Sequence, residues 1–241
     1  MRLPPTLEGR FLARENRFRV RVEVDDRVVP AHLPNSGRLS ELLTPGRPCR
    51  LVPHPEPRRR TPLDLLLVEH AGVLVSVDAR LPGPLFAEAV AEGRLLPFAR
   101  FARVEREVRC GESRLDFRLD GPGGSLWVET KSVTLVEDGV ALFPDAPTLR
   151  GQRHLRQLAL LAEQGERAAI VFVIQRPDAE AFMPHVWADP AFAAALVEAA
   201  RVGVEVYAFR CEVRPEEIRI GAAVSVRLPF TSPAPAAGPA C

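Results

Sequence analysis

The pattern of this sequence changes at Leu81-Pro82-Gly83-Pro84, and this change constrains the fold more than any other feature. Before it, short segments of alternating apolar and polar residues are separated by turn signals. After it, segments of helical periodicity alternate with strand-like segments. We therefore predict two domains, residues 1–82 and 83–228. The remaining residues, 229–241, are rich in Pro and Ala and are predicted to be disordered.

The first predicted domain consists of short β-strands. Side-chain polarity alternates from Phe18 to Val24, and Asp25-Asp26 supplies a turn after this segment. Further strand-like segments lie at 63–68 and 73–77. About five strands in this length are typical of an OB-like barrel, a fold that holds oligonucleotides in many proteins, although a fold alone does not fix a function.

The second predicted domain has the order α-βββ-α-β-α-β. The continuous apolar run near its middle is typical of a strand that is covered on both faces. Gly165 and Gly203 mark the ends of its second and third helices. The helices are predicted at 85–92, 148–164 and 190–201, and the strands at 104–110, 113–119, 126–132, 168–174 and 204–209.

Composition and charge narrow the functional classes. No apolar run is long enough to span a bilayer and the N-terminus lacks a signal-peptide pattern, so we expect a cytoplasmic protein without membrane association. Four cysteines without a CxxC pair argue against a zinc site or a disulfide framework. Residues 1–80 contain 14 arginines and 10 acidic residues, whereas the remainder contains 18 basic and 21 acidic residues. This asymmetry suits phosphate binding beside metal binding, but it is also ordinary for small domains.

One lysine, Lys131, stands among 32 basic residues, and the other 31 are arginine. On a solvated surface either residue supplies the positive charge. Only lysine offers a compact ammonium group that can hold a water molecule or a phosphate oxygen. Its presence is explained either by chance or by chemistry at the run Val128-Glu129-Thr130-Lys131-Ser132.

Strand alternation predicts the neighbours of Lys131. In the strand 126–132, Glu129 and Lys131 share one face. The apolar residues of 115–119 share a face of the preceding strand, which leaves Asp116 on the other face. A hairpin with its turn in the glycine-rich run between these strands aligns positions that sum to 245. This register places Asp116 directly opposite Glu129, with Cβ atoms roughly 5 Å apart.

Two facing carboxylates normally destabilise a sheet, but a divalent cation reverses the effect. Such oxygen ligands suit Mg²⁺ or Mn²⁺, which bind substrate phosphate through one or two protein carboxylates. With Asp116 and Glu129 as ligands and Lys131 orienting the attacking water, the pattern predicts metal-assisted hydrolysis of a phosphodiester. The alternative is structural: Asp116 is exposed and pairs with Arg114 or Arg118, and Glu129 pairs with Lys131 at the surface.

An aspartate followed by Glu-x-Lys on the next strand is the pattern of the PD-(D/E)xK nucleases, and longer runs are more specific. These runs are GRFLARENRF at 9–18, HLPNSGRL at 32–39, SRLDF at 113–117, ETKSVTL at 129–135 and FPDAPTLRG at 143–151. Through them the chain resembles the sugar fermentation stimulation protein (SfsA) family from about residue 9 to residue 228.

The resemblance implies an OB-fold joined to a PD-(D/E)xK nuclease-like domain with a mixed central sheet, and DNA binding as the activity. It implies that Asp116 and Glu129 are metal ligands and that Lys131 is catalytic. The family has valine where this chain has Thr130, and lysine where it has Arg153. Thr130 is predicted to point away from the two acids, yet its carbonyl can reach the metal. The change at Arg153 matters only if that lysine must titrate.

Other candidates are weaker. Glu88, on the first helix of the second domain, matches the place of a further acidic metal ligand in many such nucleases, but helix glutamates are often only solvated. Gln152 and His154 begin the second helix, where a phosphate can bind, although packing explains His154 equally well. Nucleic-acid contacts are also predicted for Arg10, Arg14, Arg17, His32, Asn35, Arg38 and Arg150.

Three functions are compatible with the sequence. The favoured one is a metal-dependent endo- or exonuclease acting on DNA, with RNA as the other substrate. The second, implied by the resemblance, is a DNA-binding regulator of sugar (maltose) metabolism genes that cuts nothing. The third is a binding module for another polyanion or a protein partner. The complete set of Asp116, Glu129 and Lys131 favours the nuclease. The oligomeric state stays open, and a homo-oligomer is compatible with the sequence.

Overall fold

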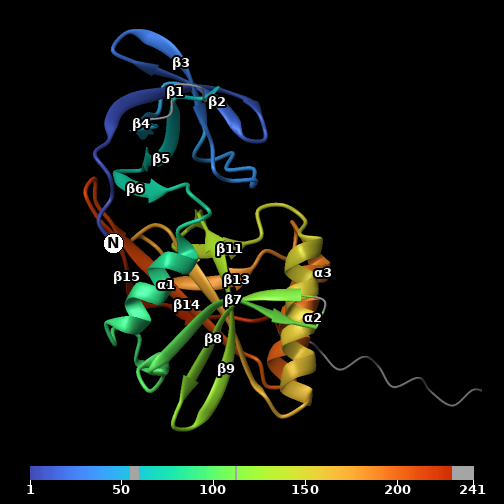
Figure 1. Cartoon of the computed structure of the whole chain (residues 1–241). Coiled ribbons are helices and arrows are strands. Elements are labelled where there is room, and N and C mark those ends of the chain that lie inside the picture. The colour runs from blue at the N-terminus through green and yellow to red at the C-terminus, as the bar shows by residue number, and fades with distance from the viewer. Residues whose placement is uncertain (55–59, 112, 230–241) are drawn as a thin grey trace, which may run out of the picture.

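The structure, a computed structural model, describes residues 1–54, 60–111 and 113–229. Figure 1 shows a β-barrel formed by the first part of the chain above a larger α/β domain. The tail predicted to be disordered, apart from residue 229, lies outside the described residues. Residues 1–3 lie against the α/β domain, since Arg2 forms a β-bridge with Glu217 and the Leu3 amide donates to the Glu216 carbonyl.

The barrel confirms the OB-like prediction. β1 and β4 are neighbours, β3 and β5 form an additional parallel pairing, and together these contacts close a ring of five strands. A sixth strand continues the sheet beside β5. Buried apolar side chains form its core, among them Phe11, Val22 and Leu65. The strands are β1 Leu7–Asn16, β2 Arg19–Val24, β3 Arg27–His32, β4 Pro48–Pro53, β5 Leu63–His70 and β6 Val73–Ser76.

The second domain contains the predicted α-βββ-α-β-α-β series around a mixed six-stranded sheet. The strand order is β15-β14-β12-β9-β8-β7, with β12 parallel to both β9 and β14 and the other pairs antiparallel. The elements are α1 Pro82–Ala91, β7 Arg103–Cys110, β8 Ser113–Gly121, β9 Gly124–Val133, α2 Leu149–Glu163, β12 Arg167–Ile174, α3 Pro190–Arg201, β14 Glu205–Val213 and β15 Ile218–Ala223, with a 3₁₀ turn η1 at Leu96–Phe98.

A second, smaller sheet was not predicted. It has the order β10-β11-β13-β16, and its strands are β10 Leu135–Glu137, β11 Val140–Phe143, β13 Ala181–Pro184 and β16 Ser225–Val226. Strands of two to four residues are too short to produce a recognisable alternation of polarity. They form because distant segments pair, which the sequence of one segment does not reveal.

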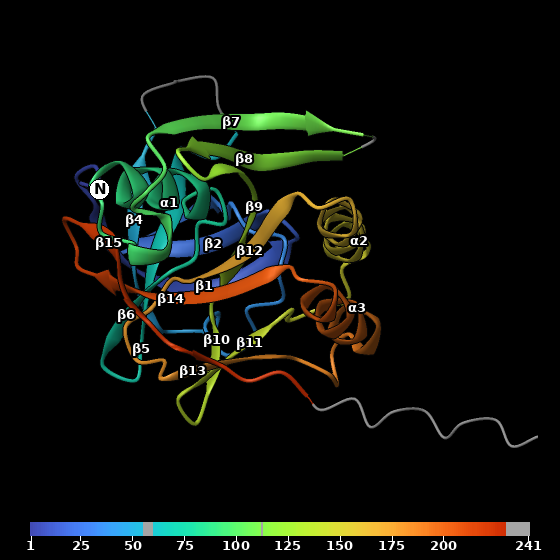
Figure 2. The same ribbon diagram turned by 90° about the horizontal axis from the view of Figure 1, so that it is seen from below.

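Two apolar cores cover the faces of the large sheet. Along β12, Val171 and Val173 pack with α1, whereas Ile170 and Phe172 pack with α2 and α3. Figure 2 shows the sheet between these helices. The fully buried β12 therefore confirms the interpretation of its apolar run.

The apolar residues of strand β8 pack in two different cores. Phe117 and Leu119 pack in the α1 core, but Leu115 packs in the core of α2 and α3. Buried positions alternate along β8 as predicted, but Leu115 lies in a different core because the residues of β8 before Phe117 are not paired with β9 and this end of the strand lies near α2. The change of core occurs at Asp116, between Leu115 and Phe117.

The barrel is joined to the α/β domain by two sets of hydrogen bonds. In the first, Ser76 donates from its amide and its hydroxyl to Gln175, at 2.9 Å in each case. In the second, the Arg38 and Leu39 amides donate to Asp145 Oδ2 at 2.7 and 3.2 Å. Position 37 must be glycine in this arrangement, because a Cβ there would lie 2.6 Å from Asp145 Oδ2.

Candidate active site

The separation of β8 from β9 places the first predicted acid. The strands pair in the predicted register, from Gly121 opposite Gly124 to Phe117 opposite Val128, and the pairing ends there. Asp116 immediately precedes Phe117 in β8, outside this pairing. Its Oδ2 accepts hydrogen bonds from the Thr130 amide at 2.8 Å and the Thr130 hydroxyl at 2.6 Å. At this point the β9 amide therefore donates to a side-chain carboxylate rather than to a backbone carbonyl of β8.

The expected orientation of Thr130 is wrong. Simple alternation predicted that this side chain points away from the acids, whereas its hydroxyl contacts Asp116. Alternation assumes that β8 continues alongside β9, and the separated strand instead brings Asp116 to the edge of β9. The Thr130 main chain lies beside the carboxylate in consequence.

Glu129 is the most enclosed charged group of the candidate site. Its exposed fraction is 2%, and Lys131 Nζ lies 2.5 Å from its Oε1. His154 Nδ1 contacts the same oxygen, and it also lies 3.4 Å from Lys131 Nζ. The second oxygen, Oε2, is buried and has no hydrogen-bond partner. A buried carboxylate oxygen without a partner is costly unless a cation or a water occupies the adjacent space.

The structural alternative placed these groups in surface pairs, and the arrangement differs. Lys131 pairs with Glu129, but the Lys131 side chain is only 12% exposed. Arg114 pairs with Glu107, and Arg118 pairs with Asp120 rather than with Asp116.

The two carboxyl groups have opposite pKa shifts. Burial raises the pKa of Asp116, and the neighbouring Glu129 charge raises it further, beyond what the hydrogen bonds from Thr130 offset. Burial would also raise the pKa of Glu129, but Lys131 and His154 outweigh it and lower this pKa below its usual value. Glu129 is therefore the group kept ionised, and Asp116 is the group more readily protonated.

The donor set fits a divalent cation with oxygen ligands. It consists of the Asp116 carboxylate and the unpartnered Glu129 Oε2, and the predicted third donor is the Thr130 carbonyl oxygen. Mg²⁺ typically takes one or two carboxylates and fills its other positions with water or phosphate oxygens. Within the described residues no cluster of three or more His, Cys, Asp or Glu side chains could hold a metal ion.

These residues open into a cleft of about 570 Å³ between the barrel and the α/β domain. The segment 143–148 and Arg150 form one side, and Arg17, Asn35 and Gly37 extend the lining from the barrel. Arg106 and Glu107 on β7 also line the cleft. Glu107 has a positive φ of 56°, and no sequence signal indicated this conformation. Asp145, which joins the domains beside the cleft, lies in a run that the resemblance had highlighted without assigning it a role.

Glu88 does not join the other acids. Its Oε2 accepts from the N-terminal ammonium of Met1 at 2.7 Å and lies 3.4 Å from the Arg94 guanidinium. It does not line the cleft. The helix position was inferred correctly, but the partner at the start of the chain is not visible from local sequence.

The two candidates on α2 have different surroundings. Gln152 is buried and donates to both carboxylate oxygens of Asp189 at 3.1 and 3.2 Å, so it connects α2 to the beginning of α3. His154 is buried as well, but it faces Glu129. His154 therefore contacts one of the candidate acids, Glu129, whereas Gln152 contacts Asp189 instead.

Several barrel residues predicted to contact nucleic acid are engaged within the protein. Arg14 donates to the carbonyls of Gly37 and Arg38 at 2.7 Å, and Asn35 donates to the Val77 carbonyl at 3.0 Å. Both side chains shape the loop that meets Asp145.

Three further barrel candidates divide between the cleft and other surfaces. Arg10 donates to the Gly46 carbonyl beside a different hollow of the barrel. His32 lies by the Phe18 carbonyl. Arg17 lines the cleft, as Arg150 does.

Two protein-family models match this chain. The model of the SfsA N-terminal OB domain matches residues 12–77, and that of the sugar fermentation stimulation protein RE domain matches residues 80–217. The chain belongs to the sugar fermentation stimulation protein (SfsA) family. The SfsA homolog of Chloroflexus aurantiacus is 46% identical over 228 residues, covering 95% of this chain and 88% of that protein. The Moorella thermoacetica homolog is 47% identical and covers 94% and 99%.

A solved structure extends this agreement to three dimensions. Pyrococcus furiosus SfsA, determined in complex with Ca²⁺, superposes with a TM-score of 0.87 at 36% identity and covers 94% of this chain and 98% of its own. Among the described residues of this SfsA protein, no helix has the length and apolar character needed to cross a membrane.

Proposed function

We propose that this protein is a divalent-cation-dependent nuclease that hydrolyses phosphodiester bonds of DNA. The observation that carries the proposal is the buried, unpartnered Oε2 of Glu129, which lies in a cleft with Asp116 and the only lysine of the chain. The Ca²⁺ complex of the Pyrococcus furiosus relative supports a cation of this type. Mg²⁺ or Mn²⁺ is the proposed catalytic ion, because these ions combine few carboxylates with phosphate oxygens.

Each side chain has a distinct role in this proposal. Asp116 and Glu129 hold the cation, which when bound polarises the phosphoryl group and makes water a better nucleophile. Lys131 orients the attacking water and stabilises negative charge that develops on the phosphate. His154 holds Glu129 Oε1, which leaves Oε2 directed to the ion. Thr130 holds Asp116 through two hydrogen bonds.

A DNA-binding regulator without catalysis has less support. Such a protein has no need to enclose an ionised glutamate beside a second carboxyl group, since both repel DNA phosphates. The arginines at the rim of the cleft fit either function, whereas the acids and the lysine inside it fit only the nuclease.

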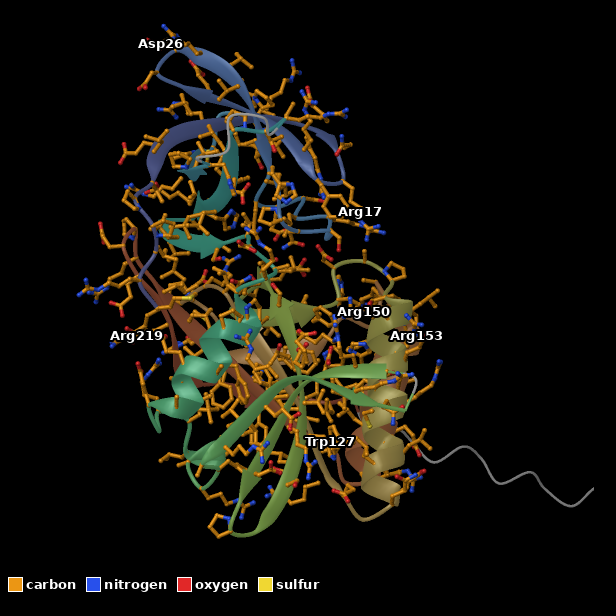
Figure 3. All side chains as sticks on the ribbon, in the orientation of Figure 1. Arg17, Asp26, Trp127, Arg150, Arg153 and Arg219 are labelled. Atoms are coloured by element: carbon orange, nitrogen blue, oxygen red, sulfur yellow. The ribbon has the colours of Figure 1, made fainter. Side chains whose placement is uncertain are left out.

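The test is cleavage of labelled single- and double-stranded DNA and RNA in Mg²⁺, Mn²⁺ or EDTA. Wild-type protein is compared with Asp116→Asn and with Glu212→Gln as a matched control. Glu212 is an exposed carboxylate that pairs with Arg219, and Figure 3 shows Arg219 on the opposite side of the molecule from Arg150. We expect metal-dependent cleavage that Asp116→Asn abolishes and the control retains. Cleavage that persists in EDTA or in Asp116→Asn would reject the proposal.

A further inference from the structure

Two aromatic side chains close in sequence to residues that contact the lining of the cleft are exposed. Phe18, in the β1–β2 turn, is 45% exposed, and Trp187, in the turn before α3, is 94% exposed. Large aromatic rings usually bury most of their surface, and tryptophan is enriched at binding interfaces. Neither residue has a role in the proposed chemistry.

Phe18 belongs to a preorganised platform on the barrel. Its amide donates to Asn16 Oδ1 at 3.0 Å, and its carbonyl accepts from the Leu33 amide at 2.9 Å, so the backbone is fixed. The His32 ring lies 6.4 Å from the Phe18 ring, and the Arg17 guanidinium lies 5.4 Å from the ring centroid. Arg17 also lines the cleft that contains Lys131, so the platform adjoins the proposed active site.

Trp187 lies in a turn whose neighbouring residues contact the lining of the cleft. The residues around it are fixed to the segment that forms the wall of the cleft. The His185 amide donates to the Phe143 carbonyl at 2.8 Å, and Asp189 Oδ2 accepts from the Thr148 amide at 2.8 Å. Trp187 therefore projects from a rigid turn beside the start of α2. Figure 3 shows Arg17 on the lower edge of the barrel and Arg150 on the facing end of α2.

We propose that Phe18 and Trp187, with Arg17 and Arg150, form a binding track for single-stranded DNA that leads into the cleft. Its relation to Asp116 and Glu129 rests on the proposed nuclease function. The combination is that of single-strand binding sites, in which bases stack on aromatic rings and cationic side chains follow the backbone. A duplex offers no free base faces along its length. A cleft of about 570 Å³ is also in the range of pockets for small ligands, which favours an unpaired strand over a double helix.

The test measures binding in EDTA, where the proposed cleavage is absent, by fluorescence anisotropy of a labelled oligo(dT) and of a blunt duplex of equal length. We expect Phe18→Ala and Trp187→Ala each to weaken oligo(dT) binding about fivefold to a hundredfold and to change duplex binding less than twofold. Phe18→Trp and Trp187→Phe should retain most of the affinity, because stacking needs a ring and not one residue type. The control is Leu96→Ala, which removes an 85% exposed apolar side chain outside the cleft.

A second readout reports direct contact. The chain has two tryptophans, and Trp187 is the fully exposed one, so oligo(dT) should quench its fluorescence and Trp187→Phe should abolish most of the quenching. Unchanged oligo(dT) affinity in either alanine variant, or an equal loss for the duplex, would overturn the track. Failure of metal-dependent cleavage with these binding results intact would instead overturn the nuclease proposal alone.

Discussion

Removal of Lys131 tests whether Glu129 is a buried charge that needs its neighbours. Lys131→Met leaves the glutamate, 2% exposed, with His154 as its remaining partner. Breaking one side of a buried ion pair costs about 3–5 kcal/mol of unfolding free energy. Because His154 still contacts Oε1, we expect a loss near the lower end, about 3 kcal/mol. Glu129→Gln combined with Lys131→Met removes both charges, and such complete replacements are often close to neutral.

The double variant should therefore lose much less stability than the sum of the two single variants. We expect a coupling energy of about 2 kcal/mol between the sites. The assay is urea unfolding at pH 7 of wild type, both single variants and the double variant, followed by circular dichroism. A coupling below about 0.5 kcal/mol, the range of independent sites, would show that Glu129 is not held as an ionised group by Lys131, and the proposed role of the lone lysine would lose its basis.

Three further outcomes are expected. Mn²⁺ binding, followed by calorimetry between pH 4 and 7, should weaken at a higher pH than the one at which an ordinary aspartate protonates, because burial and the Glu129 charge raise the pKa of Asp116; weakening only at the ordinary value would contradict this. Asp189→Ala should lower the unfolding free energy by about 1–2 kcal/mol at pH 7, since Asp189 caps α3 through the Phe192 amide. Burial opposes ionisation of Asp189, but the hydrogen bonds that its carboxylate accepts lower its pKa. Its contribution to the unfolding free energy is therefore fully present above the unfolded pKa of about 3.9 and is lost as the pH falls through the lower folded pKa. Thermal scans of Asp189→Ala at pH 7 and pH 3 check this sign, and equal losses at both would contradict it. Asp145→Ala should raise proteolysis between the domains because it removes both bonds to the barrel loop, and an unchanged digestion pattern would contradict this.

The sequence predicted the elements that have strong periodicity and missed those that depend on distant partners. The register of β8 and β9 followed from alternation, as did the shared face of Glu129 and Lys131. Thr130 was placed wrongly, and the separate core of Leu115 was missed, because both inferences extended a regular ladder through the position where the strands separate. Hydrogen bonds between residues far apart in the sequence could not be predicted either, because nothing local to Arg14 or Glu88 indicates the carbonyls or the terminus that they contact.

The resemblance and the lone lysine indicated residues that the structure brings together in one cleft, but they did not indicate the other residues that line it. That the barrel contributes Arg17 to the cleft depends on how two domains meet, which is decided by Asp145 and Gln175. Sequence reasoning treated the domains separately and assigned the barrel an independent set of contacts. The exposed rings of Phe18 and Trp187 had no sequence signal either, because exposure is a property of the folded surface.

The Asp116 side chain has two roles, because it accepts two hydrogen bonds from Thr130 and is also a proposed cation ligand. The carboxylate completes the hydrogen bonding of an interior strand at the position where the neighbouring strand has moved away. A variant that lacks the acceptor, such as Asp116→Ala, consequently leaves a main-chain amide without a partner, whereas Asp116→Asn can still accept through its amide oxygen. Loss of catalysis in the alanine variant would thus be confounded with local loosening of the sheet. The asparagine variant separates the chemistry of the site from the integrity of the fold.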